Sequence, residues 1–190
     1  LDMSGVKCMQ QGGKWIKVGI RTVLGAYPAD IRSSSGLSYD TISLNSAMFI
    51  GEYHHNVDDK GRLAIPVKFR KSFAKPGVVT RGLDRCLFFY THDEWNKLAK
   101  KLADLPIAKA NTRAFARLML AGAMDVDLDK QGRIIVPDYL RDYAGLKKKV
   151  VLAGLYNRLE LWDENAWQGY KQNTEKSSGD IAEALGELGV

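Results

Sequence analysis

The chain has 190 residues, of which 45% are hydrophobic and 26% are charged, a composition typical of a soluble globular protein. No apolar run approaches the roughly 20 residues that a membrane-spanning helix needs, so we expect no membrane partner. The net charge of +6 is a general indication of an anionic partner. The two cysteines, Cys8 and Cys86, form neither a CxxC motif nor a disulfide framework, which favours a reducing, cytoplasmic compartment.

The basic residues are concentrated in one part of the chain. Residues 52–101 hold eleven Lys and Arg against six Asp and Glu, whereas residues 123–171 hold eight of each. Residues 172–190 hold one Lys against four acids. An anionic partner would therefore be attracted chiefly by the first of these segments.

Residues 1–47 differ from the rest of the chain. They are rich in Gly and Ser, show no sustained hydrophobic period, and precede the sequence "MFIGEY". We predict a poorly ordered N-terminal extension, with Met48 as the natural start and the preceding residues read from a start codon placed too early. The alternative is a genuine but irregular N-terminal arm.

From Met48 onward the chain consists of two copies of one unit. "NVDDKGRLAIPVKFR" (56–70) aligns with "DLDKQGRIIVPDYLR" (127–141), and "VVTRGLDRCLFFYTHDEW" (78–95) aligns with "VVLAGLYNRLELWDENAW" (150–167). Five identities occur in the first pair: Asp58/Asp129, Gly61/Gly132, Arg62/Arg133, Pro66/Pro137 and Arg70/Arg141. A period of roughly 71 residues is too long for a solenoid, so we infer duplication of a small β-rich unit.

Each copy is predicted to begin with a strand, over 52–57 and 123–128, that leads into an Asp-x-x-Gly turn. The Asp side chain accepts bonds from nearby backbone N–H groups, and Gly adopts positive φ without steric cost. A second, aliphatic strand follows over 62–65 and 133–136.

Proline then ends the second strand and begins a short helix in each copy, at Pro66 and Pro137. Two further strands, joined by glycine-containing turns, lead to helices whose first turns Asp93 and Asp163 would cap or stabilise by charge. This pattern indicates a hairpin-rich α+β protein with pseudo-two-fold symmetry.

The segment 93–122 is predicted to form two helices that are separated near Pro106. Each has an apolar stripe, and the stripes consist of Leu98, Leu102 and Leu105, and of Phe115, Leu118 and Met119. Such stripes pack either within the subunit or against a neighbouring one, and both alternatives stay open.

The sequence holds no constellation of residues for catalysis. It lacks HExxH, GxSxG, GxGxxG and a complete phosphate-binding loop, and its histidines, His54, His55 and His92, form no ligand cluster. Asp58 and Asp129 each precede an arginine by four residues, which favours charge pairing over a raised carboxyl pKa. We therefore predict no enzyme activity, no metal, no cofactor and no small-molecule substrate.

The Asp-x-x-x-Arg pair suits DNA recognition better. A two-stranded β-ribbon fits the major groove, where an arginine donates two bonds to guanine O6 and N7. Arg62, braced by Asp58, would project with few rotamers, and Lys60 at the turn tip would contact a phosphate. The alternative is that both pairs, Asp58–Arg62 and Asp129–Arg133, are solvated ion pairs that only order their turns.

"MFIGEYHHNVDDKGRLAIPVKFR", together with "DLDKQGRIIVPDYLR" and "GLYNRLELWDENAW", closely resembles the MraZ family of bacterial transcriptional regulators, over essentially all of residues 48–190. The resemblance implies an α+β fold, namely a duplicated AbrB/MazE/MraZ-like swapped-hairpin β-barrel with pseudo-two-fold symmetry and flanking helices. It also implies a ring-shaped homo-oligomer that binds double-stranded DNA at G-rich direct repeats upstream of the division and cell-wall gene cluster. A protein with these partners would be cytoplasmic and nucleoid-associated.

The family's DNA-contacting motif falls on residues of both copies. They are Asp58, Lys60, Gly61 and Arg62 in the first copy, and Asp129, Gly132 and Arg133 in the second. Because Gln131 stands where the first copy has Lys60, we expect the first copy to dominate phosphate contact and the second to serve assembly. The alternative function is an AbrB-like protein–protein module of the antitoxin type.

The same alignment predicts the domain boundaries. We expect an N-terminal extension (1–47), a first SpoVT-AbrB-like repeat (52–99), a helical connector (100–122), a second such repeat (123–166) and a C-terminal tail (167–190).

Overall fold

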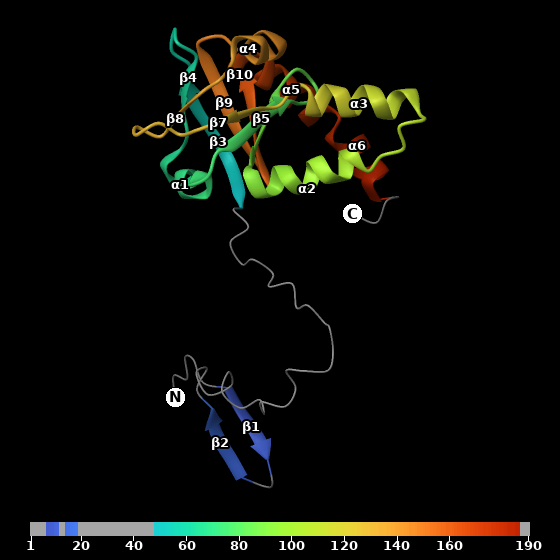
Figure 1. Ribbon diagram of the computed structural model, residues 1–190. Helices are drawn as coiled ribbons and strands as arrows, with labels where there is room; N and C mark the ends of the chain where they lie inside the picture. The colour runs from blue at the N-terminus through green and yellow to red at the C-terminus, as the bar shows by residue number, and fades with distance from the viewer. Residues whose placement is uncertain (1–6, 12–13, 19–47, 187–190) are drawn as a thin grey trace. The chain divides into compact units, whose positions relative to one another are not determined.

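The computed structural model describes residues 7–11, 14–18 and 48–186, and the chain divides into two units, 1–44 and 45–190 (Figure 1). In the first unit, β1 (Lys7–Gln11) and β2 (Lys14–Val18) form an antiparallel hairpin, which the sequence did not lead us to expect. Residues 19–47, the larger part of the predicted extension, lie outside the described residues. The start-codon hypothesis stays a prediction.

The second unit is built on a six-stranded antiparallel sheet in the order β3-β9-β10-β6-β5-β7. The strands are β3 (Phe49–Asn56), β5 (Gly77–Arg81), β6 (Leu87–Thr91), β7 (Met124–Val126), β9 (Lys149–Tyr156) and β10 (Arg158–Asp163). Two short strands, β4 (Arg62–Ala64) and β8 (Arg133–Ile135), form a separate two-stranded ribbon.

The two repeats exchange strands within this sheet. The first strand of each repeat pairs with the third strand of the other, because β3 pairs with β9 and β7 pairs with β5. The equivalent strands β6 and β10 pair at the centre, and β4 pairs with its equivalent β8. The predicted α+β class and duplication are therefore confirmed. The closed swapped-hairpin barrel stays a prediction, since the pairings among residues 48–186 give an open sheet and a separate ribbon.

One face of the sheet carries the larger hydrophobic core. This core packs against the β4–β8 ribbon, α1 (Val67–Arg70), the 3-10 helix η2 (Lys71–Phe73) and α4 (Asp138–Ala144). Phe73 stacks on Phe89 with ring centroids 4.1 Å apart, and Phe49 meets the edge of Phe69 at 5.1 Å. Strand side chains alternate between the two faces, so the ribbon is held against the sheet by its own inward side chains.

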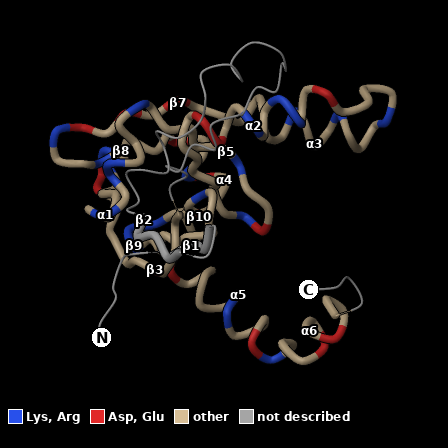
Figure 2. The backbone as a smooth tube through the Cα atoms, turned by 90° about the horizontal axis from the view of Figure 1, so that it is seen from below, with Lys and Arg blue, Asp and Glu red and all other residues tan. Residues whose placement is uncertain are grey.

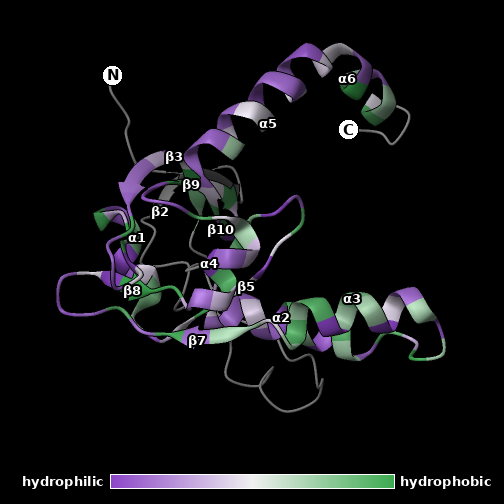
Figure 3. Cartoon of the chain, turned by 90° about the horizontal axis from the view of Figure 1, so that it is seen from above, coloured by the Kyte–Doolittle hydropathy of each residue, from purple (hydrophilic) through white to green (hydrophobic). Residues whose placement is uncertain are grey.

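The other face of the sheet is covered by helices. These are α2 (His92–Ala103), α3 (Ala110–Leu120) and α5 (Glu164–Lys176), which α6 (Ser178–Gly186) follows. Leu102 and Met119 of the predicted stripes are buried, whereas Leu105 and Phe115 stay 37% and 39% exposed. Within the subunit, therefore, each apolar stripe is buried only where it lies near the sheet. Figure 3 shows α2–α3 extending from one side of the sheet and α5–α6 from another.

The two helices that follow β6 and β10 begin at equivalent capping residues. Asp163 accepts a hydrogen bond from the Asn165 amide at 3.1 Å, which confirms its predicted role as a cap. In the first repeat the cap is Thr91, whose hydroxyl accepts from the Glu94 amide at 3.3 Å. Asp93 lies inside the first turn, where its charge favours the helix N-terminus.

Candidate nucleic-acid interface

The two Asp-x-x-Gly turns have nearly the same geometry. In the first, the Asp58 amide donates to the Arg62 carbonyl at 3.1 Å and the Gly61 amide donates to the Asp58 carbonyl at 2.9 Å. The equivalent bonds from Asp129 and Gly132 both measure 2.8 Å. Gly61 and Gly132 have φ of +73° and +76°, so both need the conformational freedom that the sequence predicted.

Each turn aspartate holds both its own turn and the arginine that follows. Oδ1 of Asp58 accepts the amides of Lys60 and Arg62 at 3.0 and 2.9 Å, and Oδ2 accepts Arg62 Nε at 2.6 Å. In the second turn, Asp129 Oδ2 accepts Nε and Nη2 of Arg133 at 2.8 and 2.6 Å. The spacing of four residues thus produces an oriented guanidinium group.

The two arginines stand on one face of the β4–β8 ribbon. Leu63 pairs with Ile134 at its centre, and both side chains are fully buried against the sheet. Because side chains alternate along a strand, Arg62 and Arg133 point to the opposite, outer face, where their side chains are 33% and 27% exposed. Figure 2 shows charged segments of both signs gathered around β8 and α1.

Each turn is also hydrogen-bonded to the other repeat. The Ile65 amide donates to the Gly132 carbonyl, and the Val136 amide donates to the Gly61 carbonyl, both at 2.9 Å. The Arg70 side chain lies directly over Gly132, where an added Cβ would collide with it. The two turns are therefore one rigid unit and not two independent loops.

Arg70 and its equivalent Arg141 pack against the turns, a role that sequence reasoning missed. Arg141 packs over Gly61, where an added Cβ would come within 3.1 Å of the guanidinium carbon, and Arg70 Nε donates to the Ile65 carbonyl at 2.8 Å. The sequence showed these arginines as an identity between the copies, but it did not show that each supports the opposite turn.

Lys130 is a further residue that the sequence comparison overlooked. It lies exposed at the tip of the second turn, next to Gln131, as Lys60 lies exposed at the tip of the first. Both turns therefore present one ammonium group, although at adjacent positions. The alignment did not reveal that both turns carry a lysine, because Lys130 aligns with Asp59.

Hydrogen bonding lowers the pKa of both turn aspartates. For Asp58 the main cause is the Arg62 backbone amide, followed by the Arg62 side chain and the Lys60 amide. For Asp129 the Arg133 side chain and then the Arg133 and Gln131 amides lower the pKa to about 2. Both groups are ionised at neutral pH, which suits charge pairing and not acid–base catalysis.

We expect the Asp129 carboxyl to titrate near pH 2 in the folded protein. Since its pKa is lowered from 3.8, its bonds stabilise the fold above that pH and are lost as the pH falls toward 2. Carboxyl ¹³C chemical shifts followed against pH would measure this, with Asp129→Asn to assign the signal. Arg133→Ala should move the midpoint back toward 3.8. A wild-type midpoint already near 3.8 would contradict the pairing.

Among the described residues, His54 makes structural contacts. His54 contacts Glu164 and Glu52 at 3.1 Å each, which ties β3 to α5. Within the described ranges, no three His, Cys, Asp or Glu side chains gather as they would to hold a metal ion. In that part of the chain, no helix is both long and apolar enough to cross a membrane.

The chain matches the family described as MraZ protein, antitoxin-like, twice, over residues 48–118 and 119–187. The chain belongs to the MraZ family. Each matched segment contains one Asp-x-x-x-Arg turn, so each MraZ segment contains one of the two copies recognised in the sequence.

Several MraZ proteins are similar over their full length. The transcriptional regulator MraZ of Halothermothrix orenii is 52% identical over 143 residues, which is 75% of this chain and 100% of that protein. The proteins of the same name from Natranaerobius thermophilus and Syntrophomonas wolfei are 47% and 45% identical over the same shares. These relatives are named as regulators of transcription and not as enzymes.

Proposed function

We propose that this chain is a sequence-specific DNA-binding transcriptional regulator. It would bind G-rich direct repeats upstream of the division and cell-wall gene cluster as a ring-like homo-oligomer, in the cytoplasm and associated with the nucleoid. The observation that carries this proposal is the β4–β8 ribbon, which presents Arg62 and Arg133 on one outer face, each held by an aspartate.

The ribbon has the chemistry that base reading needs. A two-stranded ribbon fits the major groove, and an arginine fork matches guanine O6 and N7. Among the described residues, Nη1 and Nη2 of Arg62 donate no hydrogen bond, so they are available to a base. The bond from Nε to Asp58 limits the rotamers of the side chain, which reduces the entropy lost on binding.

The proposed contact residues divide by task. Arg62 and Arg133 read bases, Asp58 and Asp129 orient them, and Gly61 and Gly132 keep the turns compact where they approach the duplex. Lys60 and Lys130 bind phosphates, which fixes register without reading sequence.

Assembly would supply the affinity that one ribbon lacks. Each bidentate contact contributes only about 1–3 kcal/mol of discrimination between bases. Several ribbons held by one oligomer would engage direct repeats about 10 base pairs apart, where each half-site faces the same side of the duplex. The linked contacts then multiply modest single-site affinities.

The proposal is tested with a labelled duplex from the region upstream of the chain's own gene, titrated at about 50 and 200 mM salt. We expect tight binding that is lost when the G-rich repeats are scrambled and that weakens steeply with salt, because lysines and arginines release counterions from phosphate. Equal affinity for the native and scrambled duplexes would overturn sequence-specific reading.

Alanine substitutions at the turn tips test which repeat dominates phosphate contact. Lys60→Ala should lower the slope of log K against log salt by about 1 for each first-repeat turn on the DNA, and Gln131→Ala should leave it unchanged. Lys130→Ala is the matched loss of charge in the second turn. An equal loss from Lys60→Ala and Gln131→Ala would contradict dominance of the first repeat, and an equal effect of the two lysine variants would assign phosphate contact to both turns.

A second candidate is an antitoxin-type protein–protein module. The family description as antitoxin-like favours it, as does the pairing of both turn arginines within their own turns. On this reading the ribbon serves architecture, and DNA binding would be indifferent to both arginines.

A further inference from the structure

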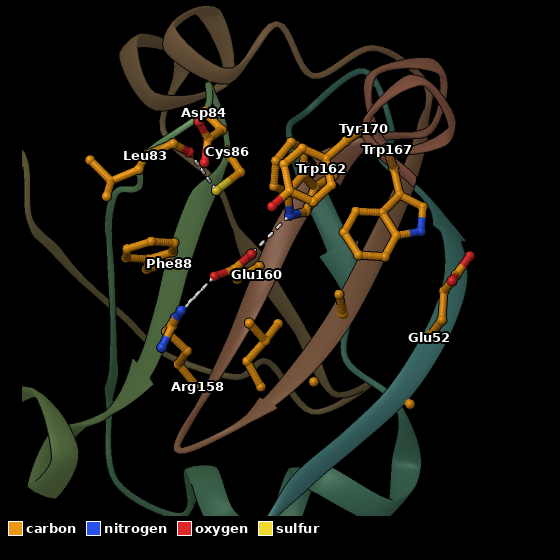
Figure 4. Close-up of a pocket in the computed structure, with 14 residues that line it drawn as sticks. Glu52, Leu83, Asp84, Cys86, Phe88, Arg158, Glu160, Trp162, Trp167 and Tyr170 are labelled. Atoms are coloured by element: carbon orange, nitrogen blue, oxygen red, sulfur yellow. Dashed lines mark hydrogen bonds and ion pairs between the residues drawn. The ribbon is translucent and has the colours of Figure 1, made fainter. Parts of the chain in front are cut away.

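The helix-covered face of the sheet is occupied unequally in the two repeats. In the first repeat α3 lies on β5, where the Thr80 hydroxyl donates to the Met119 carbonyl at 2.5 Å and both residues are buried. In the second repeat α6 follows α5 as α3 follows α2, yet no residue of α6 is buried. Over β9 and β10, the equivalent surface is instead an open pocket of about 510 Å³ (Figure 4).

This aromatic pocket has apolar walls and a self-satisfied polar floor. Its walls are Leu83, Phe88, Leu155, Trp162, Trp167 and Tyr170. On the floor, Glu160 accepts bonds from Arg158 Nη2 at 2.8 Å and from the Trp162 indole at 3.1 Å, as Figure 4 shows. The Glu160 carboxylate on the floor is therefore already hydrogen-bonded within the chain.

The charges around the aromatic pocket favour a basic occupant. Glu52, Asp84 and Glu160 line it. Glu160 is paired with Arg158 and Glu52 with Lys171, so among the described residues Asp84 is the lining carboxylate without an ion pair. The chain's own α6 is poorly suited, because its charged residues are Asp180 and Glu183. An acidic helix there would bring like charges together in a partly desolvated site.

The α2–α3 hairpin combines an apolar tip with a net positive charge over its whole length. Ile107 is 78% exposed at this tip, and Leu105 and Phe115 of the same hairpin are also exposed. Arg113 Nη1 donates to the carbonyls of Ile107 and Ala108 at 2.7 and 2.9 Å, so the tip is ordered before it meets a partner. Residues 92–120 hold six Lys and Arg against three Asp and Glu.

We infer that the hairpin tip of one copy, formed by Leu105, Ile107 and Phe115, inserts into the aromatic pocket of a second copy. The inference deepens the homo-oligomer of the proposed function by naming its contact. Figures 1 and 3 show the hairpin extending away from the sheet, and no hairpin residue lines the pocket of its own chain. The contact joins two different surfaces, so each copy uses both, and repetition forms a ring when the rotation closes.

Sedimentation velocity of the full-length chain tests the contact. Ile107→Glu and Leu155→Glu each place an acid on one of the two surfaces, at side chains exposed enough for the fold to persist. Each should raise the apparent dissociation constant of assembly at least about 30-fold, as expected for a central anchor residue. Ile107→Leu, which stays apolar, and Ile181→Glu, which adds the same charge to exposed α6, should assemble as the wild type does.

Mixing the two defective variants is the sharper test. The intact tip of the Leu155→Glu chain fits the intact pocket of the Ile107→Glu chain, while the other pairing places two glutamates together. We therefore expect a 1:1 dimer and nothing larger. A mixture that stays monomeric, a monomeric wild type, or disruption by Ile181→Glu in place of Ile107→Glu would overturn the inference.

This outcome is separable from DNA reading. Arg62→Ala and Arg133→Ala lie on the ribbon and not on either contact surface, so these variants should assemble normally even if they bind no DNA. Normal DNA binding by a protein that assembles through other surfaces would overturn the contact alone.

Discussion

Arg62→Ala is expected to abolish sequence-specific binding to the upstream repeats while leaving the fold and assembly intact. Each lost bidentate contact costs about 1–3 kcal/mol of base discrimination. Because every ribbon in the oligomer loses the same contact, we expect the affinity for the native duplex to fall by at least about 100-fold, toward that for scrambled DNA. Arg133→Ala should act in the same direction.

Two controls separate base reading from charge. Arg62→Lys keeps the positive charge but not the fork, so it should retain salt-dependent, non-specific binding and lose the preference for the native duplex. Asp58→Asn combined with Arg62→Ala removes the carboxylate that would otherwise repel phosphate. If anisotropy titrations showed unchanged specificity in Arg62→Ala, Arg133→Ala, Arg62→Lys and the double variant, the turns would be architectural and the protein–protein function would take first place.

Gly154→Ala is expected to produce the largest loss of stability among glycine substitutions in the sheet. Gly154 faces Gly51 where β3 crosses onto β9 of the other repeat. An added Cβ would lie 2.6 Å from the Ile50 amide nitrogen and 2.7 Å from the Phe49 carbonyl carbon. These are backbone atoms, which cannot rotate away as a flexible side chain can, so the free energy of unfolding should fall by about 3 kcal/mol.

Gly169→Ala is the matched control for this substitution. Gly169 lies in α5, and an added Cβ there meets nothing within 4 Å. Because alanine favours a helix over glycine, this variant should be neutral or more stable by up to about 1 kcal/mol. Urea unfolding at one fixed protein concentration measures both, since assembly contributes to apparent stability. Equal stability of the two variants would show that β3 does not pack against Gly154 in solution.

The local features of the fold were predictable from the sequence because their chemistry is local. Asp and Gly at fixed positions specify a turn. Pro66 and Pro137 mark the start of the short helices, although each stands at the N-cap, one residue before the first helical position that the sequence predicted. The strand exchange was not predictable from residue patterns. An alternating strand buries the same face against either partner, and the partner of β3 lies about a hundred residues away in β9.

The candidate interface likewise combines features that the sequence predicts with features that it does not predict. The Asp58–Arg62 and Asp129–Arg133 pairs follow from a spacing of four residues, and the structure shows both bonds. The support that Arg70 and Arg141 give to the opposite turns depends on the crossing of β4 and β8. No spacing within one repeat carries that information. The lysine at the tip of the second turn, Lys130, was missed because it aligns with Asp59 and not with Lys60.

The exchange of strands between repeats also gives the ribbon a direction. In a dimer of identical units, a two-fold ribbon would read the same from both ends and would suit a palindrome. Here both halves belong to one chain and have diverged, with Asp59 and Lys60 at one tip and Lys130 and Gln131 at the other. The interlocked backbone keeps these unequal ends in a fixed relation, so the protein would lie on its operator in one orientation, as sites repeated head to tail require.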